Sequence, residues 1–247
     1  MKRLRFIDAY RGFALVNMIV YHWFYDYANI FAMPLEWFMG TEVYVWQQWM
    51  VVSFILVSGT VLNYAKHPQL RGIFLCFCGC ILTFCTYFFI PQELIVFGIL
   101  SFLGVAMLVT RALMRCVKSP IIAFFSIFGF LLTEGWHNGY WGFYGIYFAE
   151  LKIIPPDNLL FFILGIPGTS YNSADYVPIF PWIFIFWLGA FGWIWIQGRE
   201  KFPIILKNFA FKRQDGCYNV LELLGRHTLI IYLLHQPMLY FLGKAFL

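Results

Sequence analysis

Residues 6–28 read FIDAYRGFALVNMIVYHWFYDYA and form the first long apolar segment of the chain. On a helix turning about 100° per residue, the ionisable side chains Asp8, Arg11, His22 and Asp26 fall within roughly 60° of one another. Each costs about 2.5–3.5 kcal/mol to place in hydrocarbon. The stripe is therefore predicted to face a protein interior or a wet cavity, and we interpret it as a reaction site.

The whole chain has the composition of a membrane protein. Of its 247 residues 62% are hydrophobic and only 12% are charged, with a mean hydropathy of +0.73, whereas soluble domains carry about 25% charged residues. Apolar segments long enough to cross a bilayer are predicted at 6–28, 43–65, 71–90, 95–114, 118–134, 176–197 and 220–242.

These segments predict an all-α, polytopic integral membrane bundle of about seven transmembrane helices, because they are continuously apolar and lack the alternation of barrel strands. No linker or internal repeat divides the chain, so a single domain over 1–247 is expected. The apolar stretch 158–166 is too short to cross and is expected to be an interfacial or re-entrant helix.

Basic residues predict the orientation of the bundle. Thirteen of the 17 Lys and Arg residues lie on one side of the predicted spans, and the opposite loops hold only Lys152 and Lys244. By the positive-inside rule the N-terminus is cytoplasmic and the C-terminus is outside. The net charge of +5 mostly expresses this topology, and nothing in it indicates a nucleic acid partner.

Arg11 and His22 are predicted at different depths of the first span. Eleven residues of helix separate them by about 16 Å, so Arg11 belongs in the cytoplasmic half and His22 in the outer half. A histidine with Asp26 one turn later suits a general base, because an acceptor can hold the imidazole tautomer. The alternative is a buried histidine satisfied by a helix neighbour.

The last predicted span offers further polar residues. Glu222 and Arg226 are four residues apart and are expected to form a structural ion pair. His235 lies about two turns later, nearer the depth of His22, and is a candidate for substrate binding. It is equally compatible with a polar group at a helix end.

Three other positions are candidates for ligand contacts. Gln47 lies near the outer end of the second span, and Ser58 with Gly59 lies near its inner end, where small residues allow a helix or a ligand to approach closely. Trp136 opens an aromatic, glycine-rich outer loop that suits either sugar stacking or an interfacial aromatic belt. The cysteines of the third span do not present four thiolates on one face, so no metal site is expected.

Four blocks of the sequence resemble a known family. They are the first span, FILVSG at 54–59, SADYVPIFPW at 173–182 and LGRHTLIIYLLHQP at 224–237. With these blocks the chain resembles the bacterial proteins assigned to the heparan-alpha-glucosaminide N-acetyltransferase catalytic domain, among the transmembrane acyltransferases. The chain departs from the pattern at Ser101, where related sequences often have a histidine.

The resemblance implies transfer of an acyl group, acetyl in the first instance, from cytosolic acetyl-CoA or another acyl-CoA. The acceptor would be a hydroxyl or amine of a glycan, a lipid-linked sugar or another small molecule at the membrane. Carried over by position, His22 is the catalytic base with Asp26 beside it, and Arg11 orients the thioester. The long outer domain of the lysosomal enzyme is absent, so heparan sulfate itself is not expected as the acceptor.

The remaining expectations concern the donor and the setting. Basic residues at the cytoplasmic rim, such as Arg3, Arg5, Arg71, Arg115 and Arg226, are expected to hold the CoA phosphates, with the pantetheine arm passing Ser58. The resemblance places the protein in the bacterial cytoplasmic (inner) membrane, in contact with lipid. Whether the chain forms a homo-oligomer is left open. A transporter or flippase with a buried Arg/His/Asp pathway, and a non-catalytic membrane partner, are the alternatives.

Overall fold

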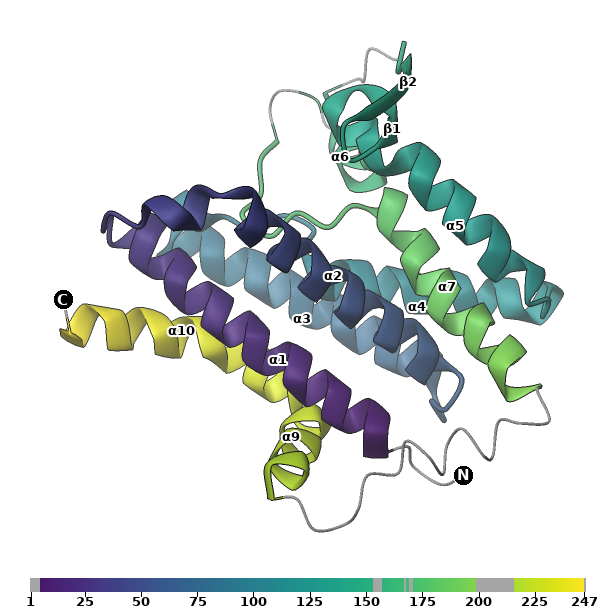
Figure 1. Ribbon diagram of the computed structural model, residues 1–247, viewed down its shortest axis with the longest axis horizontal. Helices are drawn as coiled ribbons and strands as arrows, with labels where there is room; N and C mark the ends of the chain where they lie inside the picture. The colour runs from purple at the N-terminus through teal and green to yellow at the C-terminus, as the bar shows by residue number, and fades with distance from the viewer. Residues whose placement is uncertain (1–4, 153–156, 167, 169–170, 199–215, 247) are drawn as a thin grey trace. The chain divides into compact units, whose positions relative to one another are not determined.

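The computed structural model describes residues 5–152, 157–166, 168, 171–198 and 216–246, and these are mostly helical (Figure 1). The longer helices are α1 (Arg5–Tyr25), α2 (Thr41–Leu62), α3 (Pro68–Phe89), α4 (Ile99–Cys116), α5 (Ile121–Thr133), α7 (Ile179–Gln197), α9 (Gly216–Arg226) and α10 (Thr228–Phe246). The short elements are the π-helical turn η1 (Asp26–Ile30), the 3-10 turns η2 (Glu36–Met39), η3 (Pro91–Glu93) and η4 (Glu134–Asn138), helix α6 (Leu159–Leu164), and strands β1 (Tyr140–Phe143) and β2 (Ile146–Glu150).

Four helices of the described chain are long and apolar enough to cross a membrane: α2, α3, α4 and α7. They coincide with the predicted spans 43–65, 71–90, 95–114 and 176–197, so the membrane character of the chain is confirmed. The full count of about seven spans and the cytoplasmic N-terminus remain predictions.

The other predicted spans differ from the helices that form. Helix α1 with η1 covers 6–28, but its polar stripe lowers its hydropathy. Helix α5 has 13 residues, about 20 Å of helix against a hydrocarbon core of about 30 Å. The segment 220–242 is divided at His227 into α9 and α10, and α9, with 11 residues, is too short to cross.

The described residues fall into two compact units, one from 1–57 with 200–247 and the other from 58–199. In the first unit α1 packs on α9 through two glycines. A Cβ at Gly12 would lie 1.9 Å from the Leu221 carbonyl oxygen, and a Cβ at Gly225 would lie 1.7 Å from the Asp8 carbonyl oxygen. Only glycine permits so close a crossing, which places the start of α1 directly on α9.

The C-terminal half of α1 packs on η2 and α2 through apolar side chains. Leu15, Met18 and Tyr21 of α1 form one cluster with Phe38 and Met50. This cluster fixes which face of α1 lies against α2. It therefore also fixes the direction in which the polar stripe of α1, with Arg11 and His22, faces.

In the second unit α3 and α4 are antiparallel and closely packed. A Cβ at Gly72 would contact Leu108 at 3.1 Å, and one at Gly79 would lie 2.1 Å from Ser101 Oγ. The start of α4 is tied to the block at 173–182, since Asp175 Oδ2 accepts a hydrogen bond from the Ile99 amide at 3.0 Å. That block therefore has a structural role in capping α4.

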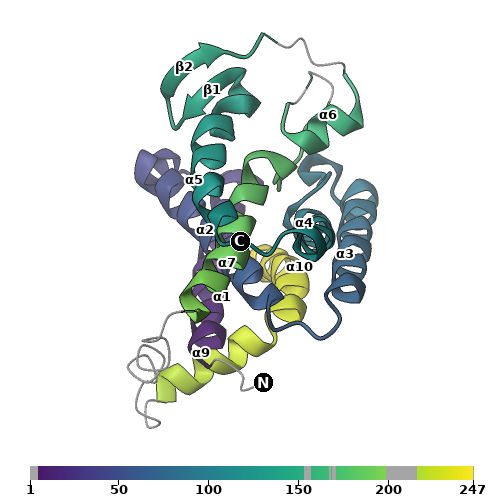
Figure 2. The same cartoon turned by 90° about the vertical axis from the view of Figure 1, so that its right-hand side faces the viewer.

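The expectation of an all-α chain is corrected by a β-hairpin after α5 (Figure 2). Strands β1 and β2 pair antiparallel, with Tyr140 opposite Glu150 and a bulge near Trp141. The turn residues Tyr144 and Gly145 both have positive φ, the backbone of a two-residue hairpin turn that matches the strand twist. The aromatic stretch predicted as a loop is thus partly strand.

Candidate functional site

His22 and His235 lie against each other where α1 packs on α10. Their ring centroids are 5.0 Å apart with an interplanar angle of 57°. His235 is 7% exposed and His22 is half-buried. The structure thus brings together two residues that are 213 positions apart (235 − 22).

Asp26, four residues after His22, also contacts α10. It is 1% exposed, and its Oδ1 accepts a hydrogen bond of 2.6 Å from Gln236 Nε2. The sequence predicted Asp26 as a companion of His22 but did not single out Gln236. The only sequence signal for Gln236 was its place beside His235. Its pairing with Asp26 depends on how two helices distant in sequence pack, which the sequence pattern does not show.

Several buried atoms of this cluster have no hydrogen-bond partner among the described residues: His22 Nδ1, His235 Nε2 and Gln236 Oε1. Leaving a buried polar atom unpaired costs about 1–3 kcal/mol, and native structures keep few such atoms outside functional sites. The side chains of His22, Asp26, His235 and Gln236, called the histidine cluster below, are therefore the candidate site.

Aromatic side chains connect this cluster to the N-terminal end of α2. The Tyr21 ring lies 5.7 Å from His22 and 5.6 Å from Trp46. Trp46 lines a pocket of about 360 Å³ with Trp37, Glu42 and Val43. Gln47, predicted to bind substrate, follows Trp46 and is half-buried.

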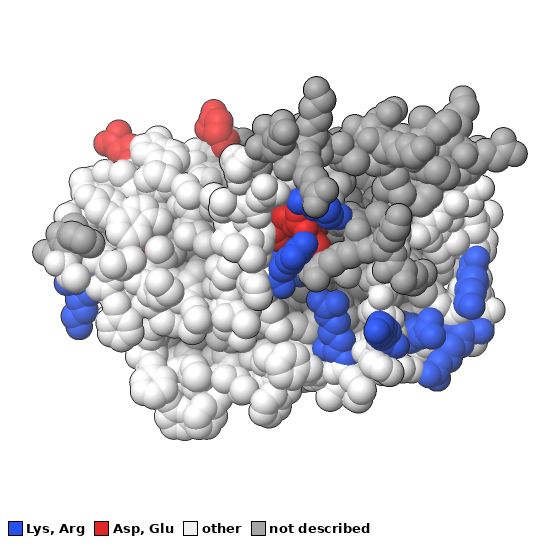
Figure 3. Space-filling model, turned by 90° about the horizontal axis from the view of Figure 1, so that it is seen from below, with Lys and Arg blue, Asp and Glu red and all other residues white. Residues whose placement is uncertain are grey.

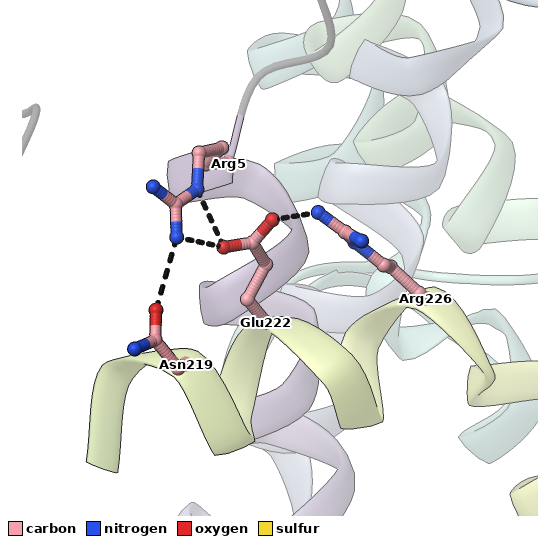
Figure 4. Close-up of polar contacts among 4 residues, drawn as sticks. All are labelled: Arg5, Asn219, Glu222 and Arg226. Carbon is pink, nitrogen blue, oxygen red and sulfur yellow. Dashed lines mark hydrogen bonds and ion pairs between the residues drawn. The ribbon is translucent and has the colours of Figure 1, made fainter. Parts of the chain in front are cut away.

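A different polar group joins the start of α1 to α9 (Figure 4). Glu222, 3% exposed, pairs with Arg226 as predicted, and it also accepts a hydrogen bond of 2.6 Å from Arg5 Nε. Arg5 Nη2 donates to Asn219 Oδ1 at 3.0 Å. Arg226 and Arg5, both expected to hold CoA phosphates, are thus engaged by Glu222, and the pairing of Arg5 with Glu222 was not predicted from the sequence. Arg3 lies outside the described residues.

The surroundings of Glu222 keep it ionised. Burial raises the pKa of Glu222, but hydrogen bonds from Arg5 and Arg226, with their positive charges, outweigh that effect and hold the pKa below its usual value. This ion group ties α1 to α9 beside the Gly12 and Gly225 contacts.

Arg11 lies half-buried on α1 between these two ends. The helix is continuous from Arg5 to Tyr25, so the separation of about 16 Å from His22 that the sequence predicted holds along α1. The thioester role of Arg11 remains a prediction.

The predicted donor residues Arg71 and Arg115 belong to the second unit. Both are exposed, and the antiparallel packing of α3 and α4 brings them to the same end of that pair. A third basic residue of α4, Arg111, is half-buried, and its Nε has no hydrogen-bond partner in the described chain. Basic side chains outnumber acidic ones on the face drawn in Figure 3.

Ser58 and Trp136 also lie in the second unit. Ser58 is half-buried beside Gly59, where a Cβ would lie 2.1 Å from the Phe186 carbonyl oxygen, so the small pair serves helix packing. The Trp136 ring lies 5.0 Å from Trp141 and 5.4 Å from Phe180. A path from these residues to His22 remains a prediction, because the two units are described separately.

The described residues contain no group of three or more His, Cys, Asp or Glu side chains that would hold a metal ion. Comparisons with curated proteins and with solved structures gave no significant match. The chain does match the family described as "Heparan-alpha-glucosaminide N-acetyltransferase, catalytic" over residues 3–237. Because this match covers nearly the whole sequence, including every member of the histidine cluster, the chain belongs to that family.

Proposed function

We propose that the protein is a membrane acyltransferase that moves an acyl group, acetyl in the first instance, from cytosolic acyl-CoA to a hydroxyl or amine acceptor. The observation that carries the proposal is the contact of the imidazoles of His22 and His235, each with a buried ring nitrogen that has no partner among the described residues, in a chain of this family. An imidazole with an available nitrogen is the usual general base near neutral pH.

In this proposal the acyl group passes directly to the acceptor in a ternary complex. The acceptor's oxygen or nitrogen bonds to the thioester carbonyl carbon as His22 takes its proton, and the carbon–sulfur bond then breaks. The proton held by His22 passes to the leaving thiolate. Arg11 or Gln47 would stabilise the oxyanion, because a positive charge or an amide N–H aimed at that oxygen lowers the barrier.

The donor would enter from the basic side of the membrane. Arg71 and Arg115 are exposed and share one end of the α3–α4 pair, which supports phosphate binding there. Arg226 is the weaker candidate because Glu222 already engages its guanidinium. The acceptor, a glycan or lipid-linked sugar in the bacterial inner membrane, would meet the donor at His22.

The proposal is tested by calorimetry of acetyl-CoA binding to detergent-purified protein, together with release of free CoA thiol. We expect Arg11→Ala to lose donor binding, and His22→Ala to bind the donor but release no thiol. Full thiol release by His22→Ala would contradict the role of His22. Absence of donor binding to folded wild-type protein would contradict acyl transfer and favour transport, and movement of a substrate without acylation would identify it.

A further inference from the structure

The contacts of His235 decide which of its nitrogens carries the hydrogen. Its Nδ1 is hydrogen-bonded to the Tyr232 carbonyl oxygen, and a carbonyl oxygen can only accept. Nδ1 must therefore be the protonated nitrogen, and in the neutral imidazole Nε2 then holds the lone pair. That Nε2 is buried and has no partner within the described part of the chain.

Gln236 is oriented by the same reasoning. Its Nε2 donates to Asp26 Oδ1 at 2.6 Å, and a carboxylate oxygen accepts, so the amide NH₂ group must face Asp26. The Gln236 Oε1 atom then points elsewhere, and it finds no donor among the residues that the structure describes. Both neighbours on α10 therefore present an acceptor atom.

These two acceptors lie within about one helical turn of each other. His235 packs on His22, and Gln236 reaches Asp26. His22 and Asp26 are four residues apart, which is about 6 Å along a helix. A ligand at this contact would meet acceptor atoms from α10 next to the proposed base on α1.

We propose that His235 Nε2 and Gln236 Oε1 form the acceptor subsite, and that they select ligands with at least two donor hydrogens, a diol or a primary amine. This inference rests on the proposed function, in which one hydrogen of the ligand is given to His22 during transfer. The remaining hydrogen is donated to His235 Nε2 or to Gln236 Oε1, and a ligand with a third donor hydrogen can bind both. A lone hydroxyl has a single hydrogen, so it cannot serve both the base and the subsite.

Two substitutions at one position separate this role from a structural one. In His235→Asn the side-chain amide replaces Nδ1 and keeps the bond to Tyr232, but it has no acceptor at the place of Nε2. In His235→Gln the side-chain oxygen reaches the place of Nε2 and keeps an acceptor there. A purely structural role predicts no difference between the two variants in ligand affinity.

The probes are a vicinal octanediol and octanol, which share one alkyl chain and differ in donor hydrogens, and octylamine, which also carries a positive charge at neutral pH. Binding is followed in detergent by nitrogen NMR of protein labelled in its histidine rings, with the His22 signal reporting occupancy. We expect the diol and the amine to bind about tenfold more tightly than octanol, the size of one lost hydrogen bond. We also expect His235→Asn to remove that advantage and His235→Gln to retain most of it.

Either of two results overturns the subsite: a proton on His235 Nε2 in the free protein, or octanol binding as tightly as the diol. Thiol release from acetyl-CoA, measured with the same probes, tests the underlying function separately. Selective binding without thiol release would refute acyl transfer while leaving a polyol or amine binding site. Thiol release that is equally fast with octanol and the diol would support acyl transfer and refute the subsite.

Discussion

The two ends of α1 solve the problem of a buried polar group in opposite ways. Near its start Glu222 is enclosed by two guanidinium groups, and glycines bring α1 against α9. Near its end His22 meets α10 at a cluster in which buried nitrogen and oxygen atoms lack partners in the described chain. The first contact uses its polar groups within the fold, whereas the second retains polar atoms that no described residue satisfies and that a ligand or water can satisfy.

This difference indicates how a structural polar group can be told from a functional one. Burial alone does not separate them, since Glu222 is 3% exposed and His235 is 7% exposed. What separates them is whether the hydrogen-bonding capacity is used within the fold. Substitution should therefore affect mainly stability at the start of α1 and mainly activity at its end.

The largest effect is expected for His22→Phe. Loss of the base should lower acyl transfer by about 10²–10⁴-fold, while the melting temperature stays unchanged or rises, because an unpartnered polar atom is replaced by an apolar ring. Thiol release and thermal melting of the same preparation measure both. His227→Phe, at an exposed histidine, is the control and should keep activity. A large loss of stability in His22→Phe would show that His22 is a structural residue.

The next effect is expected for Gly12→Ala at the start of α1. The added Cβ would lie 1.9 Å from the Leu221 carbonyl oxygen, which requires the two backbones to separate and should cost about 3 kcal/mol of stability. Chemical denaturation in detergent measures this. Gly216→Ala, with no atom within 4 Å of the new Cβ, should leave stability unchanged. Equal stability of both variants would refute the close crossing.

A smaller loss is expected for Glu222→Gln. The neutral amide cannot pair with both guanidinium groups, but the side chains of Arg5 and Arg226 are 45% and 42% exposed and can turn to solvent. The cost should therefore be about 1–3 kcal/mol, measured by the same denaturation. Glu36→Gln, at an exposed carboxylate, should have almost no effect. A loss of activity without loss of stability would assign Glu222 to the site instead.

The smallest effect is a dependence of stability on acid. The folded-state pKa of Glu222 lies below its usual value, so its contribution is complete above the unfolded pKa of about 4.3 and is lost as pH falls through the folded value. Melting curves from neutral to acid pH should show this decline in the wild type and a weaker one in Glu222→Gln. Identical curves would indicate that the ion group adds no stability.

The candidate site was partly predictable because a helix has a fixed period. His22 near the end of α1 and Asp26 at the start of η1 are four residues apart, so a single polar contact could be inferred from the helical period before any partner was known. Gln236 was not predictable as the partner of Asp26, because two hundred residues of chain separate them and only the packing of α1 on α10 joins them.

The sequence contains local signals for the break between α9 and α10 and for the β1–β2 hairpin, but the apolar and aromatic character of the surrounding residues obscures them. Gly225 and Thr228 flank the end of α9, and Thr228 Oγ1 donates to the Gly225 carbonyl oxygen at 2.7 Å, yet the apolar run continues through them. Tyr144 and Gly145 form the hairpin turn, although the surrounding aromatic residues also suit a loop at a membrane surface. Hydropathy detects burial in lipid and does not show where one element ends and the next begins.

The sequence by itself determined that the protein lies in a membrane and to which family it belongs. It also determined the apolar segments that became α2, α3, α4 and α7, and the face of α1 that carries its ionisable residues. These follow from composition, motif and helical period, which are local properties of the chain. Only the tertiary structure decided that Glu222 has two arginine partners, that His235 lies against His22, and that Gln236 is hydrogen-bonded to Asp26. Which polar groups find partners depends on helices distant in sequence packing together, and that is decided by the sum of contacts throughout the fold.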